Sequence, residues 1–79
     1  MNETTEKDMM PSLLVGYVRR SNAGGAIKIS INTNAFRDCE TYTTSDGQAY
    51  VPLVISLSAL RMVIDGDRAV TTVSQLIFE

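Results

Sequence analysis

Four side chains in the first half of the chain could together bind an anion: Tyr17, Arg19, Arg20 and Lys28. Arg19 and Arg20 end a stretch of β-forming residues, and Lys28 lies on the segment that returns after a turn. The spacing therefore predicts a basic hairpin tip with an aromatic ring nearby. Tyr50, on the outer face of a later predicted strand, could add a second ring.

Cations for phosphates and rings for base stacking are the combination with which sheets bind single-stranded nucleic acids. The same cations are also typical of a solvated hairpin whose charges prevent edge-to-edge pairing of strands. The chain has three tyrosines, two phenylalanines and no tryptophan, which is few for a stacking surface. Nucleic-acid binding is therefore the alternative function that these residues suggest, and not the main one.

The residue types on which most enzymes and metal sites depend are scarce. Without histidine and with a single cysteine, Cys39, the chain lacks the usual zinc ligands and the usual base of a serine or cysteine nucleophile. Asp65 and Asp67 flank a glycine, but an EF-hand needs a longer run of oxygen ligands and a terminal glutamate. Cys39 is expected on the apolar side of a short helix, as a small buried thiol. We expect no catalytic residue, no metal and no cofactor.

Length and composition indicate one small globular domain. The chain has 79 residues, of which 44% are hydrophobic and 20% charged, and its net charge is −2. Residues 1–10 are polar and acidic, so we expect a disordered tail and then one domain over residues 11–79. No signal peptide or membrane-spanning stretch is recognisable, and one cysteine forms no intrachain disulfide. These features predict a cytoplasmic protein that does not enter a membrane.

The first part of the domain has the pattern of a β-hairpin. Residues 13–20 are β-forming, Gly24 and Gly25 permit a reversal, and residues 26–31 alternate strictly between apolar and polar. The glycine-rich turn lacks the Lys-Ser/Thr ending of a phosphate-binding loop. The alternation places three isoleucines on one face, which we expect to be buried: Ile27, Ile29 and Ile31.

A short helix is expected next. Asn32 or Asn34 can cap a helix over residues 35–40, because an asparagine side chain accepts hydrogen bonds from the first free amides. Phe36 and Cys39 would share one side of it.

A second hairpin follows, since Asp-Gly is a strong hairpin signal. A two-residue loop at Asp46-Gly47 would place Thr44 opposite Ala49, and the returning strand would run over residues 49–57. Pro52 removes one backbone donor from that strand, so it is expected at a sheet edge or beside a bulge.

The last third predicts a helix and a closing segment. Ser58 would cap a helix over residues 59–65 that ends at Gly66, with one buried stripe: Leu60, Val63 and Ile64. Residues 68–77 are rich in valine and threonine and indicate a strand, although apolar residues at helical spacing leave a helix as the alternative.

Two strand-to-helix junctions resemble each other. Residues 29–37 and 55–61 share Ile, Ser, Ala and Arg in the same order, with two extra residues in the first. The chain is then two ββα units plus a final strand, unless the likeness is only that of any two such junctions. A duplication predicts that Arg37 and Arg61 occupy equivalent positions in their helices.

The fold expected from these patterns is α+β, with a small antiparallel sheet of four to five strands and two short helices on one face. We expect a non-catalytic binding or regulatory module that acts as a homodimer or as part of an assembly with a protein partner. A thin core and exposed strand edges favour pairing with a second copy. The alternative is a single-stranded nucleic-acid-binding protein that uses the basic hairpin tip.

Overall fold

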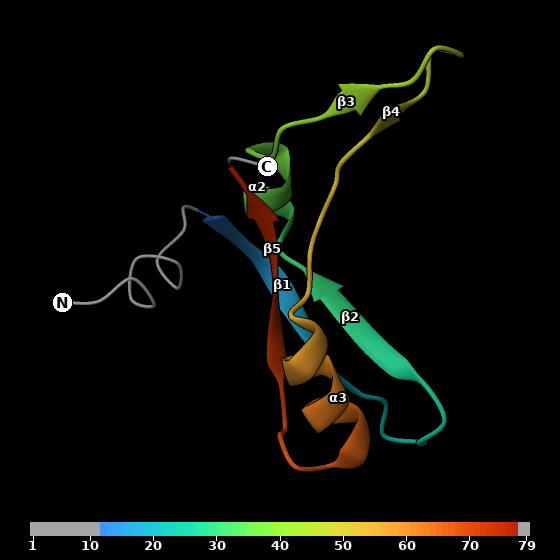
Figure 1. Cartoon of the computed structure of the whole chain (residues 1–79), viewed down its shortest axis with the longest axis vertical. Coiled ribbons are helices and arrows are strands. Elements are labelled where there is room, and N and C mark those ends of the chain that lie inside the picture. The colour runs from blue at the N-terminus through green and yellow to red at the C-terminus, as the bar shows by residue number, and fades with distance from the viewer. Residues whose placement is uncertain (1–11, 78–79) are drawn as a thin grey trace, which may run out of the picture.

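The computed structural model describes residues 12–77, and within them the predicted α+β class with antiparallel strands and two short helices is confirmed (Figure 1). The five strands form two sheets and not the single sheet that was expected. In chain order the elements are β1 (Ser12–Arg20), β2 (Ile27–Ile31), α2 (Thr33–Arg37), β3 (Tyr42–Thr43), β4 (Ala49–Tyr50), α3 (Leu57–Asp65) and β5 (Thr71–Leu76). This is the order of two ββα units followed by a strand. The tail expected over residues 1–10 lies outside the described residues.

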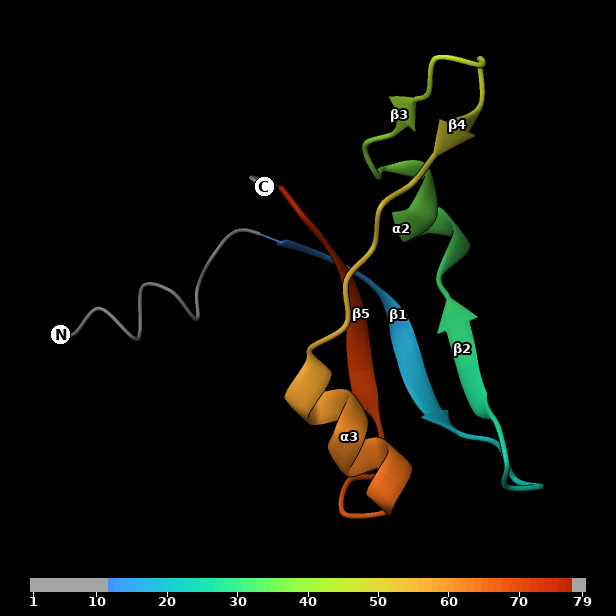
Figure 2. The ribbon, with the colours of Figure 1, turned by 45° about the vertical axis from the view of Figure 1, so that its right-hand side comes forward.

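Three strands form the larger sheet, in the order β2–β1–β5 (Figure 2). The predicted first hairpin is confirmed, with Arg19 opposite Lys28 in an antiparallel ladder. β5 pairs antiparallel with the other side of β1, with Val18 opposite Thr71. The closing segment is therefore a strand, and its alternative interpretation as a helix is wrong.

The central strand β1 contains a bulge at Val15, where its register with β5 shifts between Leu14 and Gly16. Gly16 is buried beside β2, and a Cβ atom there would stand 2.1 Å from the carbonyl oxygen of Ser30. Any other residue would displace β2, which explains a glycine inside a strand.

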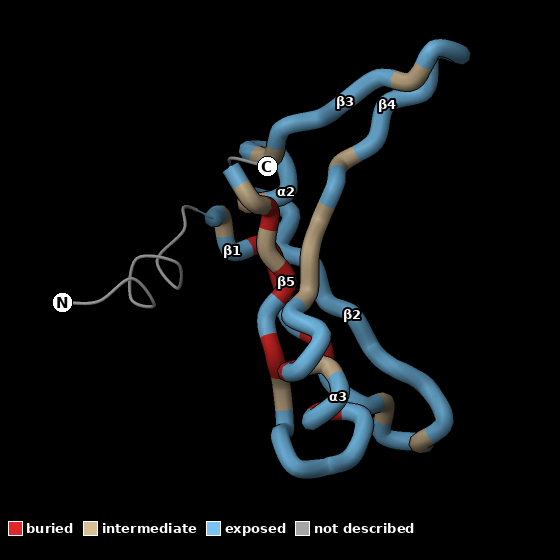
Figure 3. The backbone as a smooth tube through the Cα atoms, viewed as in Figure 1, coloured by how far each residue is buried: buried red, intermediate tan, exposed pale blue. Residues whose placement is uncertain are grey.

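α3 packs on β1 and β5, and the core lies where these three elements meet (Figure 3). It consists of five small apolar side chains: Val15, Val18, Ala59, Val63 and Val73. A helix is about 10 Å wide, or about two strand spacings. One helix therefore covers two strands of the sheet and leaves β2 bare.

The predicted C-terminal end of α3 is confirmed, whereas its predicted N-cap is wrong. Ser56, not Ser58, is the N-cap, and its hydroxyl accepts a hydrogen bond from the Ala59 amide at 3.3 Å. Gly66 ends the helix in the left-handed conformation, with a φ of 87°, as predicted. Of the predicted buried stripe, Val63 is fully buried. Ile64 is half exposed because it points toward β2, the strand that α3 does not cover.

α2 is a short helix at the end of β2. The Asn32 side chain caps it by accepting a hydrogen bond from the Ala35 amide at 2.9 Å, so the helix begins two residues earlier than predicted. Cys39 consequently lies beyond its end. Arg37 follows its cap by five residues, as Arg61 does in α3, so the two are equivalent when counted from the N-cap, but Arg37 ends α2 whereas Arg61 lies inside α3.

β3 and β4 form a separate two-stranded hairpin that projects from the rest of the structure (Figures 1 and 2). Tyr42 lies opposite Tyr50, one residue out of the predicted register. The loop has three residues and not two, because the Thr44 amide donates to the Gln48 carbonyl at 2.8 Å. Gly47, with a φ of 88°, occupies the third loop position, as is common in three-residue hairpins.

The long returning strand predicted over residues 49–57 is wrong. β4 ends at Tyr50, and the chain then runs alongside β5, to which one bridge joins it (Figure 2). In that bridge the amides of Val54 and Ser74 each donate to the other's carbonyl, at 2.7 and 3.0 Å. Pro52 lies in this stretch, outside any ladder, in agreement with its expected place at an edge.

A buried glutamine ties the projecting hairpin to the sheet. The Gln75 side chain on β5 is 3% exposed. Its Oε1 accepts a hydrogen bond from the Glu40 amide at 2.7 Å, and its Nε2 donates to the carbonyls of Glu40 and Pro52 at 2.9 and 3.2 Å. Glu40 precedes β3 and Pro52 follows β4, so one side chain holds both ends of the hairpin.

Candidate functional site

The side of β2 that was predicted to be buried is exposed. Ile27, Ile29 and Ile31 are 36%, 55% and 36% exposed, and we call this side of β2 the isoleucine face. Ile29 lies opposite Val18, so the isoleucine face belongs to the same side of the sheet as the core. The prediction of burial is wrong because α3 covers only β1 and β5.

Within the described residues, the backbone of β2 also has an unpaired side. Hydrogen bonds join the Ser21 amide to the Ala26 carbonyl and the Asn32 amide to the Val15 carbonyl. Bonded and non-bonded residue pairs alternate along an antiparallel ladder, so Lys28 and Ser30 also direct their backbone groups toward β1. Ile27, Ile29 and Ile31, which alternate with these residues along β2, therefore point their backbone N–H and C=O groups away from the sheet. These groups are free for pairing with another strand.

One end of the isoleucine face is hollowed. Arg20, Ala26, Ile27 and Ile64 are among the residues that line an open hollow between α3 and the turn of the first hairpin. Side chains alternate along β1, so Arg20 lies on the same side of the sheet as the buried Val18, facing α3, and Arg19 lies on the other side. It is therefore not part of a single basic tip with Arg19 and Lys28.

On the opposite side of the sheet, three of the predicted site residues do come together. Tyr17, Arg19 and Lys28 line a second open hollow with Ser30 and Val70. Ladder pairing explains this, since Arg19 lies opposite Lys28 and Tyr17 opposite Ser30. We call these four strand residues the cationic face.

The cationic face carries no opposing charge on its own strands. β1, β2 and β5 contain no aspartate or glutamate. Placing Arg19 directly opposite Lys28 is unfavourable, because like charges facing each other across a ladder repel. An anion bound between them would relieve that repulsion.

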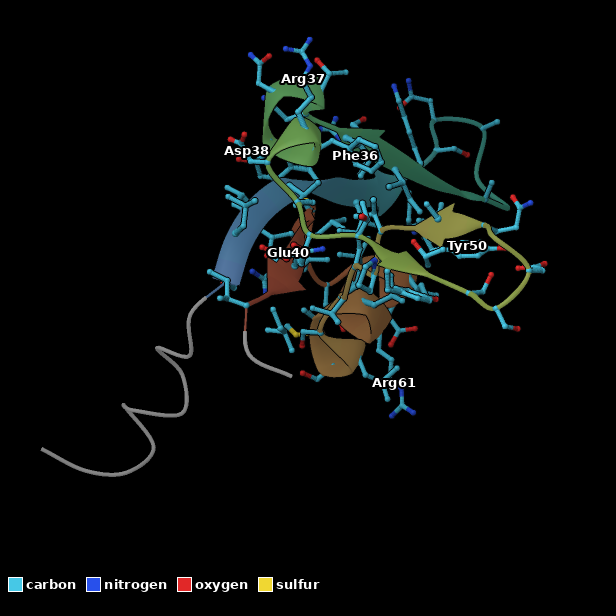
Figure 4. All side chains as sticks on the ribbon, turned by 90° about the horizontal axis from the view of Figure 1, so that it is seen from above. Phe36, Arg37, Asp38, Glu40, Tyr50 and Arg61 are labelled. Carbon is cyan, nitrogen blue, oxygen red and sulfur yellow. The ribbon has the colours of Figure 1, made fainter. Side chains whose placement is uncertain are left out.

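Tyr50 lies away from the cationic face, on the projecting hairpin (Figure 4). Its ring stacks on that of Tyr42, with centroids 5.7 Å apart and planes at 29°. Both rings remain about half exposed. Tyr50 is therefore not a second ring beside Tyr17, and its partner is the residue opposite it in its own hairpin.

The chemistry of Cys39 argues against a reactive thiol. Partial burial and the nearby Asp38 carboxylate raise the pKa of Cys39, which keeps the thiol protonated and weakly nucleophilic. Within residues 12–77, no three metal-ligating side chains of the histidine, cysteine, aspartate and glutamate types are grouped together.

Two features of the structure were not predicted from the sequence, the exposure of the isoleucine face and the role of Gln75. The alternation of β2 correctly indicates an apolar face, but no sequence signal shows how far a helix extends over a sheet. Gln75 was likewise overlooked, although it lies two residues after Val73 and therefore on the same apolar side of the strand, where a lone amide indicates a buried polar contact.

None of the helices in the described part of the chain has the length and apolar character needed to cross a membrane. Comparison of the chain with known protein families, with curated proteins and with solved structures finds no match.

Proposed function

We propose that this chain is a non-catalytic binding module that works as a homodimer, whose two copies join through β2. The observation that carries the proposal is an edge strand with both an uncovered apolar face and an unpaired row of backbone groups. Pairing with the β2 strand of another copy would cover the apolar face and give the backbone groups hydrogen-bond partners.

The spacing of β2 fits antiparallel pairing with itself about a two-fold axis at Ile29. Ile29 then faces Ile29 of the second copy, and Ile27 faces Ile31 at each side. These are the residues whose backbone groups point outward, so three bonded pairs form, with about six hydrogen bonds. On the other side of the sheet, Lys28 faces Ser30 of the second copy, and no like charges meet.

Other registers fit less well. An axis at Lys28 would place two ammonium groups opposite each other, and an axis at Ser30 would leave Ile27 without an apolar partner. A register displaced by one residue would place Lys28, whose backbone groups point toward β1, opposite an isoleucine of the second copy, whose backbone groups point toward the other strand. Hydrogen bonds of a ladder could not form between such residues. The axis at Ile29 uses every outward group of β2.

The opposite edge of the sheet is less available. Val54 bridges to Ser74 on the free side of β5, and Pro52 lies just before it in the same stretch. Proline and a covering segment are common means of blocking a sheet edge. A dimer through β2 would therefore be a six-stranded sheet whose outer edges are both protected.

A binding role fits the residue types in the chain better than catalysis does. The protonated Cys39 is a poor nucleophile, and the sequence has no histidine to act as a base. A single thiol that needs no disulfide fits a reducing compartment, and we place the protein in the cytoplasm.

The experiment is a measurement of mass by light scattering over a range of concentrations, on the wild type and two variants. Ile29→Lys places a charge at the two-fold axis, and Ile77→Lys is its matched control, since Ile77 is 51% exposed and lies after β5. We expect twice the chain mass of 8.6 kDa for the wild type and for Ile77→Lys, and the chain mass for Ile29→Lys. A wild type of 8.6 kDa at every concentration would contradict the proposal.

A further inference from the structure

We infer that the homodimer binds single-stranded nucleic acid on its outer side, across the two-fold axis, through the cationic faces of both copies. This inference rests on the proposed dimer, because pairing of β2 with itself is what joins the two faces into one surface. It differs from a basic hairpin tip, since Arg20 lies on the other side of the sheet and takes no part.

The register about Ile29 determines how the two faces join. Tyr17 lies opposite Ser30 within one copy, and Arg19 opposite Lys28. Across the axis Ser30 faces Lys28 of the second copy, so each row runs tyrosine, serine, lysine, arginine from one β1 to the other. The two rows run in opposite directions and span three strand spacings, about 14 Å. Four cations and two rings thus share one continuous surface.

The charges of this surface suit a polyanion. Each copy holds Arg19 and Lys28 side by side, and the strands on which they lie carry no carboxylate. The nearest charge partners for these side chains must therefore come from outside the sheet. A phosphate backbone that crosses the axis would meet one such pair and then the other, releasing counterions as it binds.

The rings specify which polyanion. Tyr17 is 49% exposed and lies in the same hollow as Arg19 and Lys28, so a base can stack on it while its phosphates contact the cations. Bases are accessible in this way only when unpaired, because a duplex keeps them inside its own stack. A peptide of glutamates alone would use the cations but has no ring or apolar group to stack on Tyr17. The surface therefore favours single-stranded nucleic acid over a duplex or a peptide.

The experiment is a fluorescence-anisotropy titration of the full chain with labelled single-stranded oligothymidine and oligouridine, at several salt concentrations. A labelled duplex and labelled polyglutamate are titrated in the same way for comparison. The variants are Arg19→Gln and Tyr17→Leu. Arg61→Gln is the matched control for the charge, because Arg61 is exposed and points away from the sheet on α3 (Figure 4). Tyr42→Leu controls for the loss of an exposed ring. Light scattering on each sample reports whether it remains a dimer.

We expect wild-type binding that weakens with salt. In Arg19→Gln the slope of log affinity against log salt should fall by about 1.4, since the dimer loses two phosphate contacts. Tyr17→Leu should weaken binding at least fivefold, as expected for loss of base stacking. Arg61→Gln and Tyr42→Leu should bind as the wild type does. The comparison of the two oligonucleotides identifies DNA or RNA as the preferred strand.

Three results would overturn the inference. One is a dimer that binds neither oligonucleotide at low salt, which would leave the proposed dimer intact. Another is equal affinity for a duplex or for polyglutamate of the same charge, because the ring would then contribute nothing. The third is undiminished binding by the monomeric Ile29→Lys variant, because the site would then not need both copies. A monomeric wild type would instead remove the proposed dimer itself.

Discussion

Replacing Ile29 with proline tests which groups of β2 face outward. The N–H of Ile29 points away from β1, so its loss leaves the first hairpin intact, as is usual for proline on an edge strand. In the dimer, the same N–H donates to the Ile29 carbonyl of the second copy. The substitution therefore separates folding from association, which a change on the other side of β2 would not do.

The expected loss of affinity follows from two contributions. Two hydrogen bonds at the axis disappear, worth about 1 kcal/mol each in net terms. Ile29 is 55% exposed in one copy, so its burial in the dimer contributes about 1 kcal/mol per copy, of which proline retains part. A total of about 3 kcal/mol corresponds to a dimer dissociation constant about 150-fold higher.

Sedimentation equilibrium measures this constant, and circular dichroism with urea denaturation reports on the fold. Ser30→Pro is the contrasting variant, because the Ser30 N–H faces β1 and its removal should disrupt the hairpin. A folded Ile29→Pro protein whose dissociation constant stays within tenfold of the wild-type value would refute the assigned direction of these groups. So would an Ile29→Pro variant that unfolds as readily as Ser30→Pro.

Three further predictions concern the second hairpin and the packing of β1 against β2. Gln75→Leu removes the hydrogen bonds to Glu40 and Pro52 and should lower the free energy of unfolding by about 2–3 kcal/mol in urea denaturation, whereas Gln48→Leu, on the exposed loop, should change it little. Gly16→Ala places a Cβ atom 2.1 Å from the Ser30 carbonyl oxygen and should cost about 1–3 kcal/mol, with faster amide exchange in β2; unchanged exchange would contradict the close approach. Hydrogen bonds from the Thr44 hydroxyl and the Gln48 amide lower the pKa of Asp46, so its contribution to stability is complete above the usual value of 3.8 and is lost as pH falls through the lower folded value. In a carboxyl NMR titration, Thr44→Val should raise that pKa, and an unchanged titration would show that the hydroxyl bond is absent.

Local signals in the sequence predicted the existence of most elements. Gly66 ends α3 in the left-handed conformation that glycine favours, and the Asn32 side chain caps α2. Both features can be predicted because each depends only on a few neighbouring residues. The prediction of Ser58 as the cap of α3 is wrong, because Ser56, two residues earlier, is the same residue type and takes that position.

Register and coverage depend on contacts that no short pattern contains. The observed register of the second hairpin differs by one residue from the predicted register, because Gly47 is the third residue of a three-residue loop. The Asp-Gly pattern alone indicates a two-residue loop. The isoleucine face stayed exposed because one nine-residue helix covers two strands and the other helix, with five residues, lies at the end of β2. Arg20 and Arg19 were separated onto opposite sides by strand alternation, a consequence that the prediction of a basic tip overlooked.

The most direct test of β2 pairing with a second β2 is an isotope-filtered NOE experiment on a mixture of labelled and unlabelled chains. Pairing about Ile29 places the Hα atoms of Lys28 and of Ser30 of the second copy close together, since this is a non-bonded pair with its Cα atoms about 4.5 Å apart. We predict an intermolecular NOE between these two protons. A dimer whose intermolecular NOEs avoid β2, or a chain that gives none because it remains monomeric, would contradict the account.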